Sequence, residues 1–144
     1  TAYGCNFEIA KFYNVYGPNE LVDGEWAAVI GIWRKQIEEG KPITIISDGE
    51  QRRDFTYVED ICDALYKIGM SDKKHEDAWE LGTGMNYSIN EVFSFFDERF
   101  GGLEKVHLPD VAGNYRQTLR ENDDTLEKLE WAPTDRLKEY ILSL

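Results

Sequence analysis

Apolar residues recur every three or four positions in five segments of the chain, and this spacing predicts helices at 26–39, 59–68, 88–96, 123–129 and 135–144. Gly40 and Pro42 end the first of them, because helices commonly stop at a glycine and do not continue through a proline. Ser88 and Glu91 have the spacing of a capping box at the start of the third. The neighbouring residues therefore delimit the predicted helices well.

Shorter apolar runs lie between these segments and predict strands at 7–16, 43–46, 55–58, 79–81 and 105–108. The first run ends in Gly17-Pro18, a pair that leads a strand into a loop. The polar stretch 71–77 is expected to be a surface loop. Because strands and helices alternate, we expect an α/β fold of short strands and helices, with residues 1–144 in a single domain.

The composition is that of a globular domain, with 42% hydrophobic and 13% aromatic residues among 144. A formal net charge of −12 argues against a nucleic-acid partner. No apolar run approaches the roughly 20 residues that a membrane span requires, and the first residues lack the pattern of a signal peptide. We therefore expect a cytoplasmic protein that does not contact membranes.

The cysteines and histidines do not have the spacing of a metal site, so no metal is predicted. Cys5 and Cys62 are expected to be buried free thiols. His75 and His107 have no nucleophile nearby in sequence and are expected to be structural. Four aromatic residues at helical spacing are expected in the core: Trp26, Trp33, Phe93 and Phe96.

Two motifs carry most of the functional information. Residues 11–18 end in Asn14-Val15-Tyr16-Gly17-Pro18, and residues 47–60 contain Arg53-Asp54-Phe55 after an Asp-Gly turn. In this order and spacing they resemble the extended short-chain dehydrogenases, which include the NAD-dependent nucleotide-sugar epimerases and dehydratases. The segments 81–84 and 129–133 continue the resemblance, which therefore covers nearly the whole chain.

Asn14 and Arg53 are the candidate substrate-binding residues. Asn14 is expected in the loop beyond a strand, where its amide offers a donor and an acceptor to a sugar or phosphate. The alternative is a turn residue that bonds its own backbone. The guanidinium of Arg53 suits a diphosphate, and the resemblance implies a phosphate or nucleotide contact there. The alternative is a surface ion pair with Asp54 or Glu50. Arg52 is the less suited of the two arginines.

The resemblance also implies that Phe12 and Tyr13 lie close to the nicotinamide ring and the sugar, as cofactor-binding residues. For Phe12 the alternative is ordinary core packing. The segment Gly82-Thr83-Gly84 lacks the third glycine of a dinucleotide-binding turn, so it is interpreted as a turn between a strand and a helix.

The family performs hydride chemistry with NAD or NADP through a Tyr-x-x-x-Lys pair. None of the eight tyrosines of this chain has a lysine four residues later. In the family, this pair and the glycine-rich turn precede the segment with which this chain begins. We therefore expect no catalytic residue in the chain, and expect most cofactor contacts to come from an N-terminal part outside it.

The resemblance implies that the intact protein transiently oxidises a sugar linked to a nucleoside diphosphate and then epimerises or dehydrates it. This chain would supply substrate contacts, would be inactive alone, and would self-associate as a homo-oligomer through its exposed apolar face. Val111 stands where many relatives have a nucleotide-contacting arginine, and the segments 24–29 and 109–115 resemble heptose epimerases that use an ADP-sugar. The alternative is a module without catalysis that binds a nucleotide sugar or another subunit.

Overall fold

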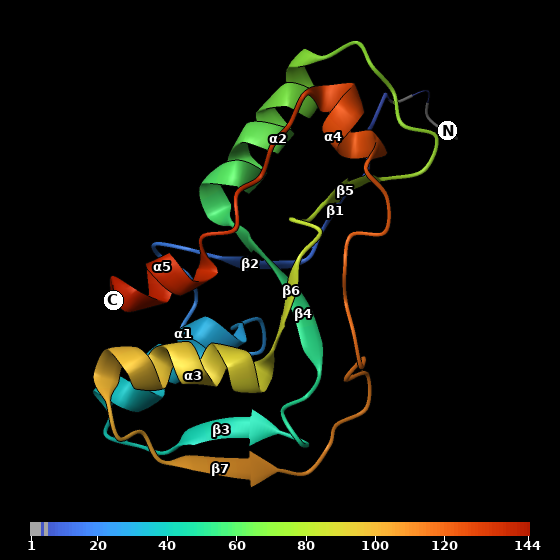
Figure 1. Ribbon diagram of the computed structural model, residues 1–144. Helices are drawn as coiled ribbons and strands as arrows, with labels where there is room; N and C mark the ends of the chain where they lie inside the picture. The colour runs from blue at the N-terminus through green and yellow to red at the C-terminus, as the bar shows by residue number, and fades with distance from the viewer. Residues whose placement is uncertain (1–3, 5) are drawn as a thin grey trace.

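The computed structural model describes residue 4 and residues 6–144, and its fold is α/β as predicted (Figure 1). Cys5 lies outside the described residues. The helices are α1 (Val29–Glu38), α2 (Val58–Met70), α3 (Ile89–Phe100), α4 (Asp124–Leu129) and α5 (Leu137–Leu142). The strands are β1 (Ala10–Phe12), β2 (Asn14–Tyr16), β3 (Ile43–Ile46), β4 (Arg52–Tyr57), β5 (Trp79–Leu81), β6 (Asn86–Ser88) and β7 (Lys105–Leu108).

The strands of the described chain form three small sheets. β1 pairs in parallel with β5, β3 pairs in parallel with β7, and β4 lies between parallel β2 and antiparallel β6. The single strand expected at 7–16 is therefore divided. Its first part pairs with β5 and its second with β4, so the chain changes partner at Tyr13. β4 begins three residues earlier than expected, because its ladder with β6 already includes Arg52.

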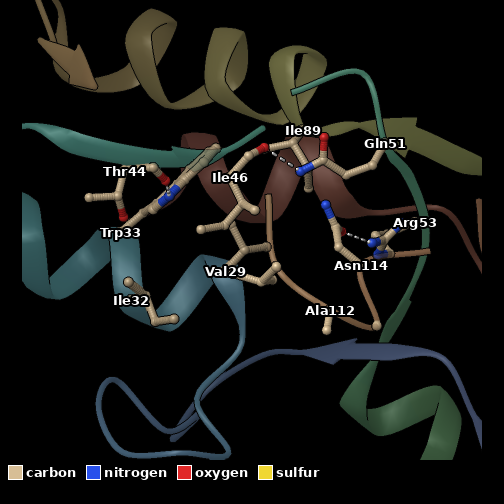
Figure 2. A pocket seen from close by; sticks show the side chains of 12 residues that line it. Val29, Ile32, Trp33, Thr44, Ile46, Gln51, Arg53, Ile89, Ala112 and Asn114 are labelled. Atoms are coloured by element: carbon tan, nitrogen blue, oxygen red, sulfur yellow. Dashed lines mark hydrogen bonds between the residues drawn. The ribbon is translucent and has the colours of Figure 1, made fainter. Parts of the chain in front are cut away.

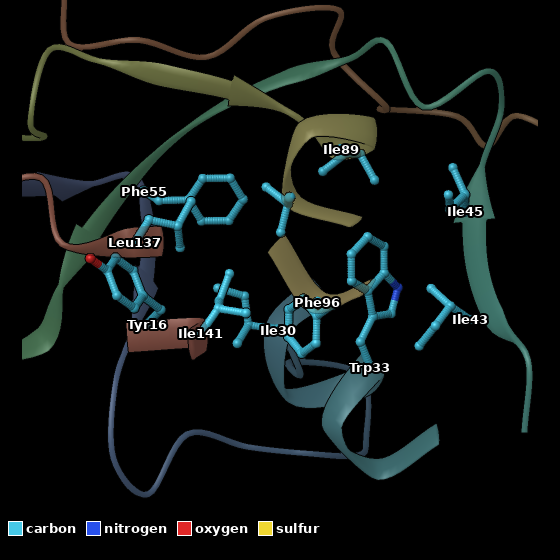
Figure 3. Packing of buried hydrophobic residues seen from close by; sticks show 11 residues of the cluster. Tyr16, Ile30, Trp33, Ile43, Ile45, Phe55, Ile89, Phe96, Leu137 and Ile141 are labelled. Carbon is cyan, nitrogen blue, oxygen red and sulfur yellow. The ribbon is translucent and has the colours of Figure 1, made fainter. Parts of the chain in front are cut away.

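Two hydrophobic clusters form the core. In Figure 3, Trp33 of α1 lies against Phe96 of α3, edge to face at 5.5 Å between ring centroids, while Leu137 and Ile141 of α5 close the cluster. The second cluster lies under α2 and contains Ile61, Ala64, Trp79, Leu81, Leu129 and Trp131. Figure 1 shows β4 in the middle of the molecule, where it leads from the side of β3 and α3 to the start of α2. The polar residues of β4 therefore lie between the two hydrophobic clusters.

The prediction that Trp26 is a core residue is wrong, because its side chain is 84% exposed. α1 begins only at Val29, and the preceding residues form a turn in which the amide of Ala27 donates to the carbonyl of Gly24. The other three aromatic residues were assigned correctly. Trp33 and Phe96 are buried, and the partly buried Phe93 packs against them.

The prediction of a buried thiol at Cys62 is also wrong. Ile61 and Ala64 occupy the buried face of α2, which leaves Cys62 and Leu65 on the solvent side. The segment 71–77 forms the loop that its polarity predicts. No described helix has the length and apolar character needed to cross a bilayer.

The capping box predicted at Ser88 is confirmed. The Ser88 hydroxyl accepts from the Glu91 amide at 3.1 Å, and the Glu91 carboxylate accepts from the Ser88 amide at 2.7 Å. Both bonds satisfy amides that have no partner within the helix. The start of α3 is therefore fixed by its own sequence.

We expect Ser88→Ala to lower the free energy of unfolding by about 1 kcal/mol, because it leaves an amide at the helix start without its acceptor. Ser94→Ala, in the exposed middle of α3, is the matched control and should change that free energy by less than about 0.5 kcal/mol. Urea denaturation followed by circular dichroism measures both. Equal losses in the two variants would contradict the capping role.

Candidate functional site

Arg53 is the second residue of β4, and it lines a pocket of about 390 Å³, called here the Arg53 pocket (Figure 2). Its guanidinium donates to Asn114 Oδ1 at 2.7 Å and to the carbonyl of Arg52 at 2.8 Å. Partial burial lowers the pKa of Arg53 from its ordinary value. The arginine is held in place by neutral acceptors.

Arg53 takes part in none of the ion pairs that the described residues form, although acidic residues outnumber basic ones by 28 to 16 in the chain. The alternative of an ion pair with Asp54 or Glu50 does not hold. Asp54 accepts from the segment 83–84 and from Arg120, and Glu50 Oε1 accepts from the Asn90 side chain at 2.6 Å. A partly buried cation without a carboxylate partner suits an anionic ligand.

The lining of the Arg53 pocket is apolar on one side and polar on the other. Figure 2 shows Val29, Trp33 and Ile46 from α1 and β3 on the same side of the pocket. Gln51 and Asn114 lie beside the guanidinium, and the Gln51 amide is fixed by donating to the Ile46 carbonyl at 2.9 Å. The complete lining is Val29, Ile32, Trp33, Thr44, Ile46, Gln51, Arg53, Ile89, Val111, Ala112, Gly113 and Asn114. Such a lining suits a flat ring joined to an anionic group.

A second pocket of about 640 Å³, called here the Tyr13 pocket, forms where the chain passes from β1 to β2. The three remaining candidates line it: Phe12, Tyr13 and Asn14. The other lining residues are Lys11, Tyr115, Gln117, Thr118, Leu119 and Glu121. The structure thus brings these three candidates to one pocket.

Phe12 and Asn14 differ from the expectations drawn from the sequence. Phe12 is 50% exposed, so the alternative that it is ordinary core does not hold in the described structure. Asn14 was expected in a loop, but it lies in β2 opposite Phe55 of β4. The loop prediction is wrong because the change of pairing partner at Tyr13 starts a new short strand at Asn14. Neither the loop nor the turn alternative for Asn14 is therefore observed.

The two pockets share a wall. Residues 116–118 run alongside β4, since the Arg52 amide donates to the Arg116 carbonyl at 2.9 Å and the Thr118 amide donates to the Arg52 carbonyl at 3.0 Å. Just before this pairing, Asn114 lines the Arg53 pocket and the next residue, Tyr115, lines the Tyr13 pocket. The linings of the two pockets therefore meet along this segment.

A buried carboxylate holds this wall in place. Asp54 is fully buried and accepts from the amides of Thr83, Gly84 and Arg120 at 2.9, 3.0 and 3.1 Å. The Thr83 hydroxyl adds a bond at 2.8 Å. A Cβ at Gly82 would lie 2.6 Å from Asp54 Oδ2, so the turn needs glycine there. The segment 82–84 is thus a structural turn, as predicted, although it leads first into β6.

Sequence reasoning missed this arrangement. Asp54 was considered only as an ion-pair partner, and Arg120, which is buried and donates to the Gly82 carbonyl at 2.9 Å, was not identified. Asn114 and Glu80 were missed for the same reason, because Asn114 lies 61 positions from Arg53, and Glu80 lies 69 and 67 positions from Lys11 and Tyr13. Local spacing holds no signal for such contacts.

Arg52 and the two histidines have structural partners. Arg52 donates to the side chain and the carbonyl of Asn86, both at 2.8 Å, in agreement with its lower suitability as a ligand contact. His75 pairs with Asp124 at 2.7 Å, and His107 contacts the Ser47 carbonyl at 2.8 Å. Among the described residues, no group of three or more acidic, histidine or cysteine side chains could hold a metal ion.

Comparison with known proteins gives the family. The model of the NAD dependent epimerase/dehydratase family matches residues 1–82, which is more than half of the chain. The chain belongs to this family. The UDP-glucuronate 4-epimerase of Thermodesulfobacterium geofontis is 31% identical over 96% of this chain and 42% of its own length. The UDP-glucose 4-epimerase of Mycolicibacterium smegmatis is 30% identical over 89% of this chain and 41% of its own.

Solved structures of family members have the same fold. The UDP-glucose 4-epimerase of Thermotoga maritima, solved with UDP-glucose, superposes with a TM-score of 0.85 at 31% identity, over 97% of this chain and 45% of that one. The UDP-N-acetylglucosamine 4-epimerase of Methanobrevibacter ruminantium, in complex with UDP-N-acetylmuramic acid, gives 0.85 at 27% identity, over 98% and 45%. The chain thus spans less than half the length of the relatives and structures that it matches.

We expect Asp54→Ala to lower the free energy of unfolding by about 3 kcal/mol or more, because it leaves several buried donors without an acceptor. Asp48→Ala, which removes an exposed carboxylate paired with Arg116, is the control and should cost less than about 1 kcal/mol. Guanidinium denaturation measures both. Similar losses in the two variants would show that the buried carboxylate has no special role.

Proposed function

We propose that this chain forms the nucleotide-sugar-binding part of an NAD(P)-dependent epimerase or dehydratase. The observation that carries the proposal is Arg53, a partly buried guanidinium without a carboxylate partner in the described structure, on the polar side of the Arg53 pocket. Several solved relatives contain bound UDP-sugars, which agrees with this proposal. The nucleotide and the sugar of this protein's own substrate are not implied by those ligands.

The nucleoside diphosphate end of the substrate is proposed to occupy the Arg53 pocket. The apolar side chains of α1 and β3 would pack against the base, and the Arg53 guanidinium would bind two oxygens of the diphosphate. Val111, which is 54% exposed, lies on this pocket where many relatives have an arginine. Arg53 is therefore the only cationic side chain of the pocket lining in the described structure.

The sugar is proposed to occupy the Tyr13 pocket. Asn14 would exchange hydrogen bonds with sugar hydroxyls, while the exposed ring of Phe12 and the ring of Tyr13 would pack against the nicotinamide end of the cofactor. Two aromatic side chains at the edge of an open pocket fit a flat ring of this kind. NAD or NADP, when bound, would accept the hydride from the sugar. The residues of this chain would bind and orient the reactants.

The acid–base pair is proposed to lie in another part of the whole protein. No Tyr-x-x-x-Lys pair occurs in the 144 residues, and the chain spans less than half the length of its relatives. Most of the cofactor contacts would come from that other part. We further propose that the protein is cytoplasmic. It would self-associate through exposed apolar side chains such as Phe7 and Ile9.

We expect Arg53→Met to weaken binding of a nucleoside diphosphate by about tenfold or more, because charge-assisted hydrogen bonds to the phosphates are lost. Arg116→Met removes the same charge from an exposed ion pair with Asp48 and should leave the affinity within about twofold. Calorimetric titration with UDP, dTDP, GDP and ADP measures the affinities and identifies the base. Equal weakening by both variants would indicate only a general charge effect.

We expect the coding sequence of the whole protein to contain a glycine-rich turn after a strand and a Tyr-x-x-x-Lys pair, both encoded upstream of Thr1. The chain of 144 residues should show no turnover with NAD and a nucleotide sugar, whereas the longer protein should be active. A whole protein without that pair would favour the module that binds without catalysis. Turnover by the 144 residues alone would show that the acid–base pair lies within them.

A further inference from the structure

Glu80 is a buried carboxylate in the middle of β5 for which the proposed function has no role. Its exposed fraction is 9%, and it receives three hydrogen bonds. Oε1 accepts from the Tyr13 hydroxyl at 3.0 Å and from Lys11 Nζ at 3.2 Å, and Oε2 accepts from the Glu121 amide at 3.1 Å. A buried carboxylate with this many donors is strongly stabilised in one orientation.

All three donors belong to residues that line the Tyr13 pocket. Lys11 lies in β1, Tyr13 lies at the change of partner between β1 and β2, and Glu121 follows the segment that forms the wall shared by the two pockets. Glu80 itself does not line the pocket. One carboxylate behind the pocket thus connects three separate parts of its lining.

The contact with Tyr13 matters most, because Tyr13 lies where the chain changes partner. The neighbours Phe12 and Asn14 are held by β5 and β4 respectively, whereas the ladders of both strands leave Tyr13 out. The hydroxyl of Tyr13 is held by its hydrogen bond to Glu80. Because the phenol donates its proton to Glu80, its oxygen can offer only lone pairs to a ligand.

We infer that Glu80 is a positioning residue for the sugar end of the site: it fixes the Tyr13 ring against the pocket and sets its hydroxyl as an acceptor toward the ligand. The inference rests on the proposed placement of the sugar in the Tyr13 pocket. It assigns the ligand group beside Tyr13 to a hydrogen-bond donor, such as a sugar hydroxyl. The Arg53 pocket does not depend on this contact.

Electrostatics agree with this geometry. Although burial opposes it, the hydrogen bonds from the Glu121 amide, Tyr13 and Lys11 hold the pKa of Glu80 below its ordinary value. Burial and the adjacent Glu80 carboxylate raise the pKa of the Tyr13 phenol, against the opposing effect of Lys11. The described contacts thus keep Glu80 ionised and Tyr13 protonated at neutral pH.

The test compares Glu80→Gln with Glu76→Gln, which removes one negative charge from an exposed position just before β5. An amide keeps one acceptor oxygen and places an NH₂ group against a donor, so the arrangement around Tyr13 is lost. In Glu80→Gln the pKa of Tyr13 should fall toward about 10. The measurement is ultraviolet titration of the phenol, isolated by subtracting the same variant carrying Tyr13→Phe.

The second readout is the ratio of the affinity for UDP-glucose to the affinity for UDP. If another nucleoside diphosphate binds best, that diphosphate and its nucleotide sugar replace this pair. Glu80→Gln should weaken binding of the nucleotide sugar by about tenfold and leave that of the diphosphate within about twofold. Glu76→Gln should change neither affinity nor the Tyr13 titration. This pattern separates positioning from a loss of stability, which would weaken both ligands alike.

An unchanged pKa of Tyr13 in Glu80→Gln would overturn the inference, and so would equal weakening of both ligands. The phenol titration requires no ligand. If the wild-type protein binds no nucleotide sugar at all, the proposed function fails while the titration still decides whether Glu80 positions Tyr13. The two failures are therefore distinguishable.

Discussion

The hydrogen bonds to the Asp54 carboxylate are the interaction on which the arrangement of the site depends. A carboxylate buried this deeply is stable only where donors replace its lost water, and here amides of Thr83, Gly84 and Arg120 supply them. These donors come from two loops that are distant in sequence. By binding both, Asp54 fixes the loops on β4 beside Arg53. Neighbouring side chains of a strand point to opposite faces, so the residue that anchors the loops leaves the guanidinium free for the pocket.

The change of pairing partner at Tyr13 is the second constraint, and it follows from the divergence of β4 and β5. Phe12 is paired opposite Leu81 and Asn14 opposite Phe55, in two different sheets. In an unbroken strand these side chains would alternate between two faces. The break brings three consecutive residues to one pocket instead. It also leaves the middle residue in need of a side-chain anchor, which Glu80 provides.

The sequence predicts those parts of the fold that depend on neighbours along the chain. The capping box of α3, the strands β3, β5 and β7 and most helix positions follow from spacing and turn residues. Trp26 and Cys62 were misplaced because periodicity and residue type do not show where a helix starts or which of its faces is covered. Four candidate site residues came from the family resemblance, and the structure brings them to two adjoining pockets. Their anchors were not predicted, because Asp54–Arg120 and Glu80–Tyr13 join residues 66 and 67 positions apart.

The charge of the 144 residues bears on the proposed binding of an anionic substrate. With a net charge of −12, the long-range field repels a nucleoside diphosphate, so affinity must come from short-range contacts. A diphosphate also carries more negative charge than the single guanidinium of the Arg53 pocket neutralises, and Val111 adds no charge to the lining. Packing of the base against the side chains of α1 and β3 would then contribute a larger share of the binding free energy than the ionic contacts of the phosphates do. Because apolar packing depends on the shape of the base more than on its charge, the walls of this pocket are where selection among nucleotides would be decided in the proposed complex.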